Sequence, residues 1–504
     1  MNMILRLPFL VILMGIASLA MLVPMALAVR LDDFFTVRVF LDCAGLFLLL
    51  TGLIALATVN FRPENTARSH LIALFVAFAG LPVMLAVPLL YLVPDAGFFR
   101  LYFEMVSCLT TTGATIFDDP ARLSEPVHLW RALVGWLGGL LILVAAISIF
   151  APLNLGGFEV YASRAASDIS GGMTRIRAAD AAERLVAFGL RITPIYVTLT
   201  VLLAFGLLMS GERAFNAVIL AMATLSTSGI TAGTGMETSG AGAPGEVLVL
   251  LVLILTVSRL VFTAERRSLT LAMLFGDKEF RLMLVFITVL PGLLFLRHWY
   301  GALEVNEQEN APAALQALWG SVFTTLSFLT TTGFVSAHWD TAQNWSGLGT
   351  PGLILLVLAV MGGGVATTAG GVKLLRIYAL YKHGMREMQK LAHPSSVGGA
   401  GRAARHIRRE GAYVAWLFFM LFAVASALVM LALSLAGLDF SESLVYAVAA
   451  LSTTGPLVPV VLHETSGYAD LNQMARAILC LAMIVGRMET LAIIALMNPE
   501  FWRR

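Results

Sequence analysis

Charged residues are scarce in this sequence. Of its 504 residues only 13% are charged, whereas 59% are hydrophobic and the mean hydropathy is +0.86. A soluble globular chain has about 25% charged and about 45–50% apolar residues. A core of this size cannot bury so much apolar surface, which argues against a water-soluble enzyme. The composition therefore predicts a polytopic membrane protein.

A basic excess and clustered cysteines are also missing. The 33 Lys and Arg are nearly balanced by 31 Asp and Glu, so the chain has no strong basic excess that would attract nucleic acid. The three cysteines, Cys43, Cys108 and Cys480, lie far apart in apolar context and indicate neither a disulfide framework nor a metal site. We find no His/Glu metal box and no Ser/His/Asp set at a plausible depth. We therefore expect no enzyme activity, no organic cofactor and no nucleic-acid partner.

Ten apolar segments are long enough to cross a bilayer, whose core of ~30 Å requires ~20 helical residues. They lie near 7–29, 38–60, 70–93, 127–151, 184–209, 246–264, 280–298, 350–380, 413–437 and 474–497. Between some of them lie amphipathic stretches that are too short to cross and too apolar to be free loops. These stretches, which we expect to be short helices, lie near 98–111, 213–227, 314–331 and 440–453.

The distribution of Lys and Arg predicts which loops face the cytoplasm. Segments 152–191, 259–281 and 373–409 are rich in both residues, whereas 299–350 and 438–472 contain neither and carry several acids. Ten spans then place both termini in the cytoplasm. Acidic outer loops would also raise the local concentration of cations, although avoidance of outer positive charge explains them equally well.

The first span has an alternative interpretation. Residues 1–28 could be a signal peptide with Ala26-Leu27-Ala28 as its cleavage site. The apolar run from Leu7 to Ala28 is, however, longer than the usual signal core of about 7–15 residues. We expect a retained helix. Cleavage would leave nine spans and the same cytoplasmic C-terminus.

One short motif occurs four times in register. Each copy contains Leu-(Ser/Thr)-Thr-(Ser/Thr)-Gly: SCLTTTGATIF at 107–117, ATLSTSGITAG at 223–233, SFLTTTGFVSA at 327–337 and AALSTTGPLVP at 449–459. Their glycines are 116, 104 and 122 residues apart. Each copy follows a span and a short outer helix and precedes another span. This order predicts a helix pair at 1–62 and four tandem repeats, at 63–160, 161–270, 271–390 and 391–504.

The motif has the chemistry of a cation filter. Non-helical backbone at membrane depth is tolerated only where it is buried in protein or lines a watery cavity. Four such loops around one axis would stack rings of carbonyls that replace a cation's hydration shell. Glycine permits the required backbone angles, hydroxyls can bond back to the wall, and the helix C-termini favour a cation. A single copy would be a glycine-terminated helix cap, an interpretation that four copies in register weaken.

At these residues the sequence resembles the Trk/Ktr/HKT superfamily of potassium transporters, most closely its TrkH/TrkG-type membrane subunits. The likeness covers nearly the whole chain, and segments 133–144, 360–376 and 484–503 fit it too. It implies an all-α integral membrane fold: two N-terminal helices, then four tandem M1–pore helix–M2 repeats around a pseudo-fourfold pore. It also implies a homodimer in the bacterial inner membrane, K⁺ as the transported and bound ion, and control by a cytoplasmic TrkA-type nucleotide-binding ring. The chain itself has no nucleotide fingerprint.

By position, the resemblance implies a K⁺ filter built from four triplets. They are Thr111, Thr112 and Gly113; Thr227, Ser228 and Gly229; Thr331, Thr332 and Gly333; and Thr453, Thr454 and Gly455. In this family a serine at the first glycine is associated with Na⁺ permeation, so four glycines favour K⁺. Two loops depart from the pattern: Ile230 stands where an aromatic residue is expected, and Ser452-Thr453-Thr454 stands where asparagines are common.

Two features inside the membrane predict a gate. Segment 360–376 contains five glycines and two threonines, a composition that favours an unwound segment over a straight helix. Close helix packing would require spaced glycines, whereas these are consecutive. These residues are Gly362, Gly363, Gly364, Thr367, Thr368, Gly370 and Gly371. Arg487 lies near mid-membrane in the last span, where a charge costs ~2.5–3.5 kcal/mol and should face a polar interior. The resemblance implies a gating loop and an electrostatic barrier here, while pairing with Glu489 remains an alternative for Arg487.

Other transport mechanisms were weighed against a channel-like pore. A transporter with inverted repeats would place alternate motifs on opposite sides, but all four face outside. An ion-coupled K⁺ symporter or another secondary cation transporter stays open, since the sequence does not show whether permeation is passive or coupled. The basic loops at 164–191 and 373–409 offer docking charge for a regulatory ring, although the positive-inside rule explains them too.

Overall fold

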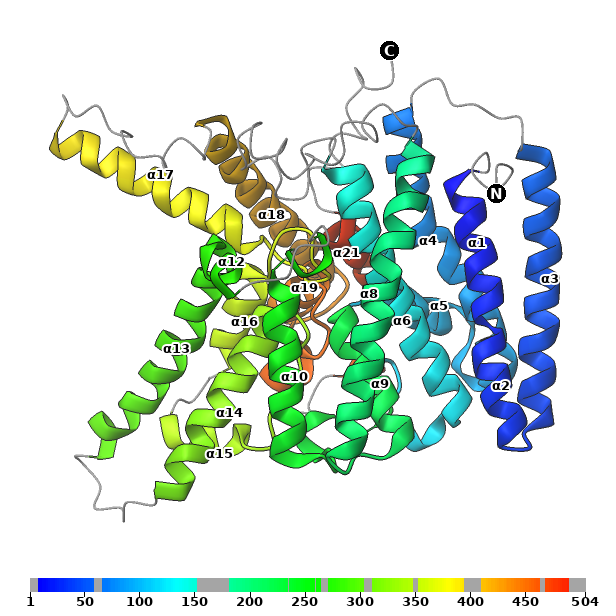
Figure 1. The fold of residues 1–504 in the computed structure, drawn as a ribbon, viewed down its shortest axis with the longest axis horizontal. Coiled ribbons are helices and arrows are strands. Elements are labelled where there is room, and N and C mark those ends of the chain that lie inside the picture. The colour runs from blue at the N-terminus through cyan, green and yellow to red at the C-terminus, as the bar shows by residue number, and fades with distance from the viewer. Residues whose placement is uncertain are drawn as a thin grey trace.

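A computed structural model describes residues 8–58, 66–151, 181–233, 235–258, 260–263, 271–302, 311–347, 352–393, 409–462 and 467–488. All regular structure in these residues is helical, and the long helices run side by side in one bundle (Figure 1). Seven helical segments of the described chain are long and apolar enough to cross a membrane. This architecture agrees with the predicted all-α integral membrane fold.

The N-terminal helices form an antiparallel pair. α1 (Phe9–Ala20) and α2 (Leu22–Arg30) make one crossing, and α3 (Phe34–Thr58) returns. The turn between them has a left-handed φ of 56° at Asp32, and the Asp33 carboxylate accepts a 2.6 Å bond from the Thr36 hydroxyl. Beyond the exposed Arg38 and Asp42 near its start, α3 is apolar on every face, and exposed side chains such as Leu56 (72% exposed) face outward. A helix that is hydrophobic all round belongs in lipid.

Four groups of three helices follow, each with a long first helix, a short helix and an inner helix. They are α4 (Thr66–Leu92), α5 (Phe98–Leu109) and α6 (Glu125–Ala145, extended by the π-helical turn Ala146–Phe150); α8 (Ala181–Met209), α9 (Ala214–Ser226) and α10 (Gly242–Val257); α13 (Lys278–Ala302), α14 (Ala311–Leu329) and α16 (Gly352–Met361); and α18 (Arg409–Leu435), α19 (Phe440–Leu451) and α21 (Gln473–Met488). The four short helices α5, α9, α14 and α19 match the predicted amphipathic stretches to within a few residues.

Smaller helices join these groups. They are η2 (Pro94–Ala96), η3 (Pro120–Arg122), η6 (Met236–Thr238), α11 (Leu260–Thr263), α12 (Leu271–Gly276), α15 (Trp339–Ser346), α17 (Leu374–Ala392) and α20 (Leu457–Leu462). α17 leaves the bundle at a steep angle (Figure 1). Local sequence explains some boundaries: α19 begins with a capping box formed by Asp439 and Glu442.

Three predicted spans differ from uninterrupted helices. For 246–264 the prediction is wrong, because α10 ends at Val257, where Ser258 is extended and donates its hydroxyl to Asp277 at 2.8 Å. The span at 350–380 divides into α16 and α17. The last span is described only as far as Met488, and the remainder of 474–497 lies outside the described residues.

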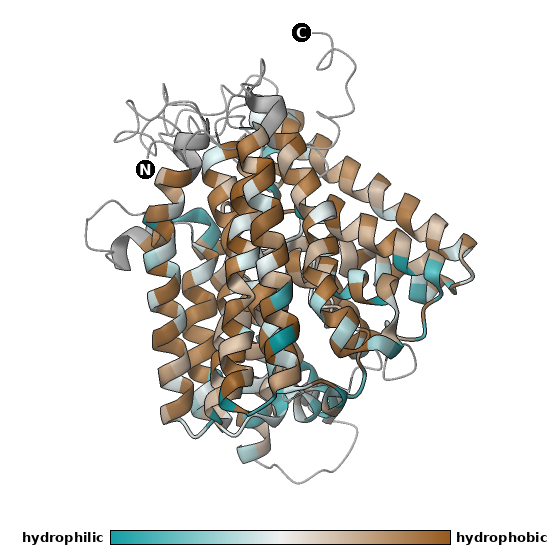
Figure 2. Ribbon diagram, turned by 90° about the vertical axis from the view of Figure 1, so that its right-hand side faces the viewer, coloured by the Kyte–Doolittle hydropathy of each residue, from teal (hydrophilic) through white to brown (hydrophobic). Residues whose placement is uncertain are grey.

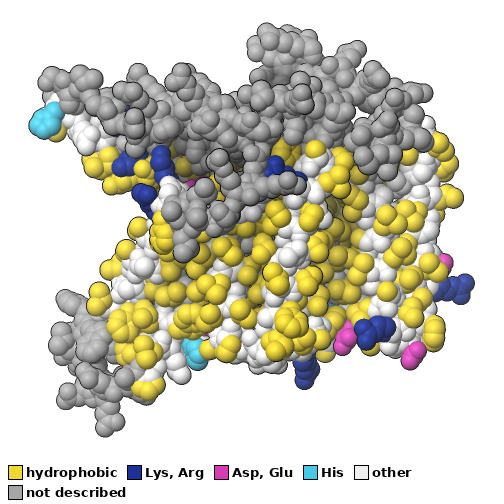
Figure 3. Space-filling view, in the orientation of Figure 1, with side chains coloured by type: hydrophobic (Ala, Val, Ile, Leu, Met, Phe, Trp, Pro, Cys, Tyr) yellow, Lys and Arg dark blue, Asp and Glu magenta, His cyan; other side chains and the backbone are white. Residues whose placement is uncertain are grey.

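Burial separates the centre of the bundle from its edge. In the apolar window of α6 83% of residues are buried, against 17% for α18, so inner helices form the core while first helices face outward. The ribbon coloured by hydropathy is hydrophobic along most of these helices (Figure 2). A space-filling view shows hydrophobic side chains over most of one face, with charged ones gathered near its upper and lower margins (Figure 3). Such a surface suits a bilayer.

Candidate functional site

Each short helix ends in a loop that carries the repeated motif, and the four loops share one unusual backbone conformation. We call residues 111–113, 227–229, 331–333 and 453–455 the glycine loops. Their first residues have left-handed φ angles: Thr111 54°, Thr227 50°, Thr331 57° and Thr453 55°. A β-branched residue rarely adopts this conformation, which costs roughly 1–3 kcal/mol. The same strain at four equivalent positions is more than a helix cap requires.

Equivalent hydrogen bonds fasten every glycine loop to its own short helix. The amide of the middle residue donates to the carbonyl five residues earlier: Thr112 to Ser107 (2.9 Å), Ser228 to Ala223 (3.0 Å), Thr332 to Ser327 (2.9 Å) and Thr454 to Ala449 (2.8 Å). The same residue's hydroxyl bonds to the hydroxyl two residues before it, at 2.8, 2.9, 3.0 and 3.2 Å in the four copies. The sequence repeat is therefore also a repeat of polar contacts.

The four glycines lie where neighbouring loops meet. A Cβ atom added to any of them would clash with a neighbouring loop. On Gly113 it would lie 2.0 Å from the Ser228 carbonyl oxygen, and on Gly229 it would lie 2.2 Å from the Thr332 carbonyl oxygen. On Gly333 it would lie 2.8 Å from Pro456 Cβ, and on Gly455 it would lie 2.3 Å from the Ala114 amide nitrogen. The Gly455 amide also donates to the Thr112 carbonyl at 2.6 Å. Each loop thus touches the next in chain order, and the fourth touches the first. The glycine loops close into a ring that has no room for a side chain.

The fourth loop departs from the others. Gly113, Gly229 and Gly333 have left-handed φ angles of 63–81°, whereas Gly455 does not. Gly455 precedes Pro456, which restricts its backbone, and the proline ring packs against Gly229 and Gly333. The Tyr468 hydroxyl holds the Gly455 carbonyl at 3.0 Å. The ring is therefore only approximately fourfold.

Three buried hydroxyls on this ring have no hydrogen-bond partner among the described residues: those of Thr111, Thr227 and Thr453, which are at most 1% exposed. Buried polar atoms are nearly always partnered. Three orphaned oxygens at equivalent positions fit a bound cation. The fourth equivalent, Thr331, instead accepts a bond from the Gly370 amide at 2.8 Å.

The predicted gating glycines lie in a non-helical segment between α16 and α17. We call residues 362–373 the inner segment; it contains Gly362, Gly363, Gly364, Thr367, Thr368, Gly370 and Gly371. It doubles back, because the amides of Val372 and Lys373 donate to Val360 and Met361 at 2.9 Å. Gly362 and Gly371 make the reversals possible with φ angles of 70° and 74°.

The inner segment contacts several repeats next to the ring. The Thr368 hydroxyl donates to the carbonyl of Leu225, two residues before the second glycine loop, at 3.3 Å. A Cβ atom on Gly370 would be 2.1 Å from the Ser452 carbonyl. The buried Glu279 carboxylate on α13 accepts the Val365 amide at 2.8 Å. The segment therefore covers the side of the ring at which the short helices end.

Arg487 on α21 holds the same segment. It is 4% exposed, and Nη1 donates to the Thr368 carbonyl at 2.6 Å. Nε and Nη2 are buried without partners among the described residues. A cavity of about 20 Å³ separates this side chain from Gly370 and Gly371, room for one water at most. The alternative partner, Glu489, lies outside the described residues.

A wide acidic cavity lies on the other side of the ring. Its volume is about 660 Å³, and all four glycines line it together with Asp118, Glu237 and Asp340. No Lys or Arg is among its lining residues in the described chain. Burial raises the pKa of Asp118, assisted by Asp470, and burial with the nearby Asp340 raises the pKa of Glu237. The carboxylates of Asp118, Glu237 and Asp340 give the cavity a negative potential, which attracts cations.

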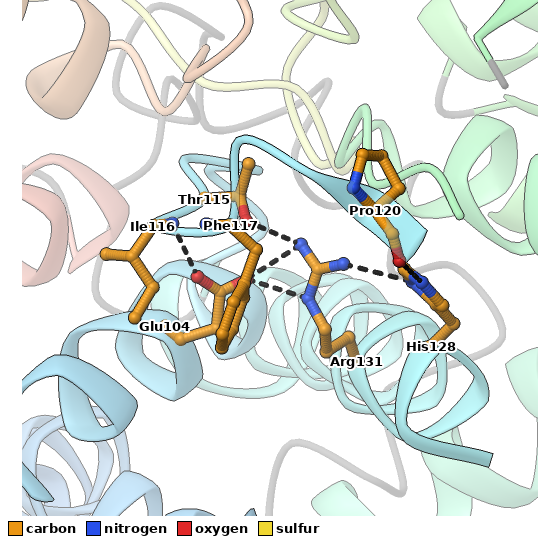
Figure 4. Close-up of polar contacts among 7 residues, drawn as sticks. All are labelled: Glu104, Thr115, Ile116, Phe117, Pro120, His128 and Arg131. Carbon is orange, nitrogen blue, oxygen red and sulfur yellow. Dashed lines mark hydrogen bonds and ion pairs between the residues drawn. The ribbon is translucent and has the colours of Figure 1, made fainter. Parts of the chain in front are cut away.

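A buried ion pair behind the first loop was missed by sequence reasoning (Figure 4). Arg131 Nε on α6 donates to Glu104 Oε1 on α5 at 2.7 Å, and the two side chains are 5% and 0% exposed. Glu104 Oε2 accepts the Ile116 amide and Arg131 Nη2 donates to the Thr115 hydroxyl, both at 2.9 Å. The pair thus fixes the chain directly after Gly113. A lone Glu in an apolar short helix was the available signal.

Together these features define a class: a four-repeat membrane protein with a ring of strained loops between an acidic outer cavity and an inner obstruction, as in a channel-like cation transporter. A family model described as "Cation transport protein" (TrkH) matches residues 253–503. The Trk system potassium uptake protein TrkH of Halomonas elongata is 30% identical over 431 residues, covering 85% of this chain and 83% of that protein. Its Salmonella typhimurium namesake is 29% identical, covering 80% and 79%.

The fold comparison agrees. The crystal structure of the potassium transporter TrkH from Vibrio parahaemolyticus superposes with a TM-score of 0.81 over 100% of both chains, at 23% sequence identity. The chain belongs to the Trk family of potassium transporters. The resemblance drawn from the repeated motif, and the fold that it implied, are confirmed.

Proposed function

We propose that this chain is the pore-forming subunit of a Trk-type potassium-uptake system and that the glycine loops are its selectivity filter. The closed ring of four equivalent strained loops carries the proposal. The relatives named as potassium uptake proteins support it. Thr111, Thr112 and Gly113 and their counterparts in the other three loops would surround K⁺, which is the cargo and not a resident cofactor.

The order of the parts gives the path of the ion. The acidic cavity concentrates cations from outside. At the ring K⁺ exchanges its water for loop oxygens, because the backbone is already fixed by bonds to the short helices. The free hydroxyls of Thr111, Thr227 and Thr453 add oxygens on the inner side.

The inner segment and Arg487 would close this path. The segment occupies the inner side of the ring, so conduction requires it to move. Arg487 adds a fixed positive charge in a buried site, where Coulomb repulsion of a cation is much stronger than in water. Both oppose permeation in the described state.

The setting is part of the proposal. The chain would work in the bacterial inner membrane with both termini cytoplasmic, as a homodimer, with repeats divided at 63, 161, 271 and 391. A TrkA-type ring would control it from the cytoplasmic side. α17 continues directly from the inner segment and carries Lys382, Arg386 and Lys390, so a ring docked there would pull on the gate through a short covalent route.

Flux measurements test this proposal. The purified protein would be placed in liposomes, and K⁺, Rb⁺, Na⁺ and Li⁺ uptake compared with and without a TrkA-type ring. We expect K⁺ and Rb⁺ to exceed Na⁺ and Li⁺. Absence of cation flux under every condition would reject the function. Uphill K⁺ accumulation driven by a H⁺ or Na⁺ gradient would instead establish the alternative, an ion-coupled symporter.

A further inference from the structure

Another buried carboxylate stands behind the glycine loops, and no cationic side chain of the described residues pairs with it. Glu246 lies near the start of α10, in the second repeat, and is 1% exposed. Among the described residues the ion pairs are Arg38–Asp42, Arg122–Asp95 and Arg131–Glu104. Glu246 belongs to none of them. Its charge is therefore not cancelled as that of Glu104 is.

The partners of Glu246 are neutral donors from the third repeat. Oε1 accepts the Ala337 amide at 2.7 Å and Oε2 accepts the Trp319 Nε1 proton at 2.5 Å. The Ser336 hydroxyl lies 2.9 Å from both oxygens. These donors satisfy the hydrogen-bonding capacity of both carboxylate oxygens without supplying a positive charge.

Glu246 is close to the ring. Ala337 follows Gly333 by four residues, so its amide is no more than about 14 Å away, and the chain between them lines the outer cavity through Phe334 and Val335. At this distance a buried unit charge changes the free energy of a bound cation measurably. The first and third loops are thus fastened by different means: a neutral ion pair and a charged carboxylate.

We infer that Glu246 is a positioning residue that raises the affinity of the glycine loops for monovalent cations by its uncancelled charge. It does not touch the ion; it acts through the field and through the third loop that it holds. The inference rests on the proposed function, since it assigns to Glu246 a share of the cation affinity of the same site.

Glu212 offers a matched control. It is also buried, at 5% exposed, and the donors to its carboxylate in the described part of the chain are neutral: Ser239, Asn216 and the amides of Arg213 and Ala241. It stands before α9, whose 13 residues span about 20 Å between it and the second glycine loop. Glu212→Gln and Glu246→Gln remove one buried charge each, at different distances from the ring.

The experiment measures Rb⁺ uptake into liposomes against Rb⁺ concentration for the parent, Glu246→Gln and Glu212→Gln. We expect Glu246→Gln to raise the half-saturating concentration about three- to tenfold, and Glu212→Gln to raise it less than about twofold. Equal values for the parent and Glu246→Gln would overturn the inference. So would equal shifts in both variants, which would reflect net charge alone.

Two further results keep the test decisive. If Glu246→Gln does not yield a folded protein, Trp319→Phe is measured, because it removes a neutral donor and retains the charge. Half-saturation within about twofold of the parent is expected; a shift of the size predicted for charge loss would show that loop position matters instead. A parent without Rb⁺ flux rejects the proposed function, whereas a conducting parent with an indifferent Glu246 rejects only this inference.

Discussion

The outer and inner halves of the candidate pore are built on opposite principles. On the outer side four loops repeat the same φ angles and the same hydrogen bonds. On the inner side the obstruction is one segment from one repeat, residues 362–373, held by Arg487 from another repeat. Coordination of a symmetric ion benefits from equivalent ligands around it, whereas closing a path requires only one movable obstacle.

The same comparison holds at single residues. Thr331 has the same backbone conformation as Thr111, Thr227 and Thr453, but its hydroxyl accepts a hydrogen bond from the Gly370 amide. It is the point where the symmetric ring is fastened to the asymmetric segment. Variants that separate the two halves should therefore have distinct effects.

The largest effect is expected at the ring. Gly113→Ser places a side chain against the Ser228 carbonyl, which would be 2.0 Å from its Cβ. The displaced loop should reduce K⁺ over Na⁺ preference by about tenfold or more, the equivalent of ~1.4 kcal/mol in relative ion binding. Parallel K⁺ and Na⁺ fluxes measure it.

Gly437→Ser is the control for backbone strain. Gly437 has a φ of 98° but open space around it, so the same substitution strains the chain without touching the ring. We expect unchanged selectivity there. If selectivity is unchanged in Gly113→Ser as well, the ring does not determine the preference for K⁺ over Na⁺.

The next effect is expected at the obstruction. Arg487→Ala, or a shortened inner segment, should raise basal K⁺ flux about tenfold without a regulatory ring, because a buried repelling charge or a steric block is lost. Selectivity should stay as in the parent. Arg476→Ala is the control: Arg476 is buried on the same helix but binds the carbonyls of Tyr468 and Ala469. A leak in both variants would point to general loosening of α21.

A smaller effect distinguishes two equivalent threonines. Thr331→Val removes the acceptor of Gly370 and should raise basal flux a few-fold, because one hydrogen bond contributes about 1 kcal/mol. Thr111→Val removes a free hydroxyl instead. It should raise the half-saturating K⁺ concentration and leave basal flux unchanged. Concentration series on both variants measure the two quantities together. Identical behaviour would remove the proposed link between ring and segment.

The smallest effect is expected in the acidic cavity. Glu237→Gln should raise the half-saturating K⁺ concentration about twofold in low salt. In high salt it should leave that concentration unchanged, because salt screens exposed charges. Acidification should mimic this variant early, since the raised pKa of Glu237 makes it lose its charge at a higher pH than an ordinary carboxylate. A salt-independent effect would contradict an electrostatic origin.

The sequence was sufficient to predict the repeated elements of the fold and those that depend on neighbouring residues. The four motifs and the lengths of the short helices placed α5, α9, α14 and α19, and consecutive glycines indicated the inner segment. The end of α10 could not be predicted, because the apolar stretch resumes at Leu260 after only two polar residues, while the helix stops where Ser258 meets Asp277.

Contacts between distant residues were also beyond the sequence. Glu104 meets Arg131 across 27 positions, Thr331 meets Gly370 across 39, and Glu246 meets Ala337 across 91. Composition does not show such pairs, because they depend on how the repeats pack around the axis. For the same reason the sequence does not show that Pro456, the residue after Gly455, packs against Gly229 and Gly333 in the ring.

The most direct test of the account is to locate the ion. Crystals of the protein grown in Rb⁺ would be measured at the rubidium absorption edge. We predict anomalous density on the axis of the glycine loops, between the acidic cavity and the inner segment, next to the hydroxyls of Thr111, Thr227 and Thr453. An ordered ring without density there, with Rb⁺ bound elsewhere in the molecule, would contradict the central claim.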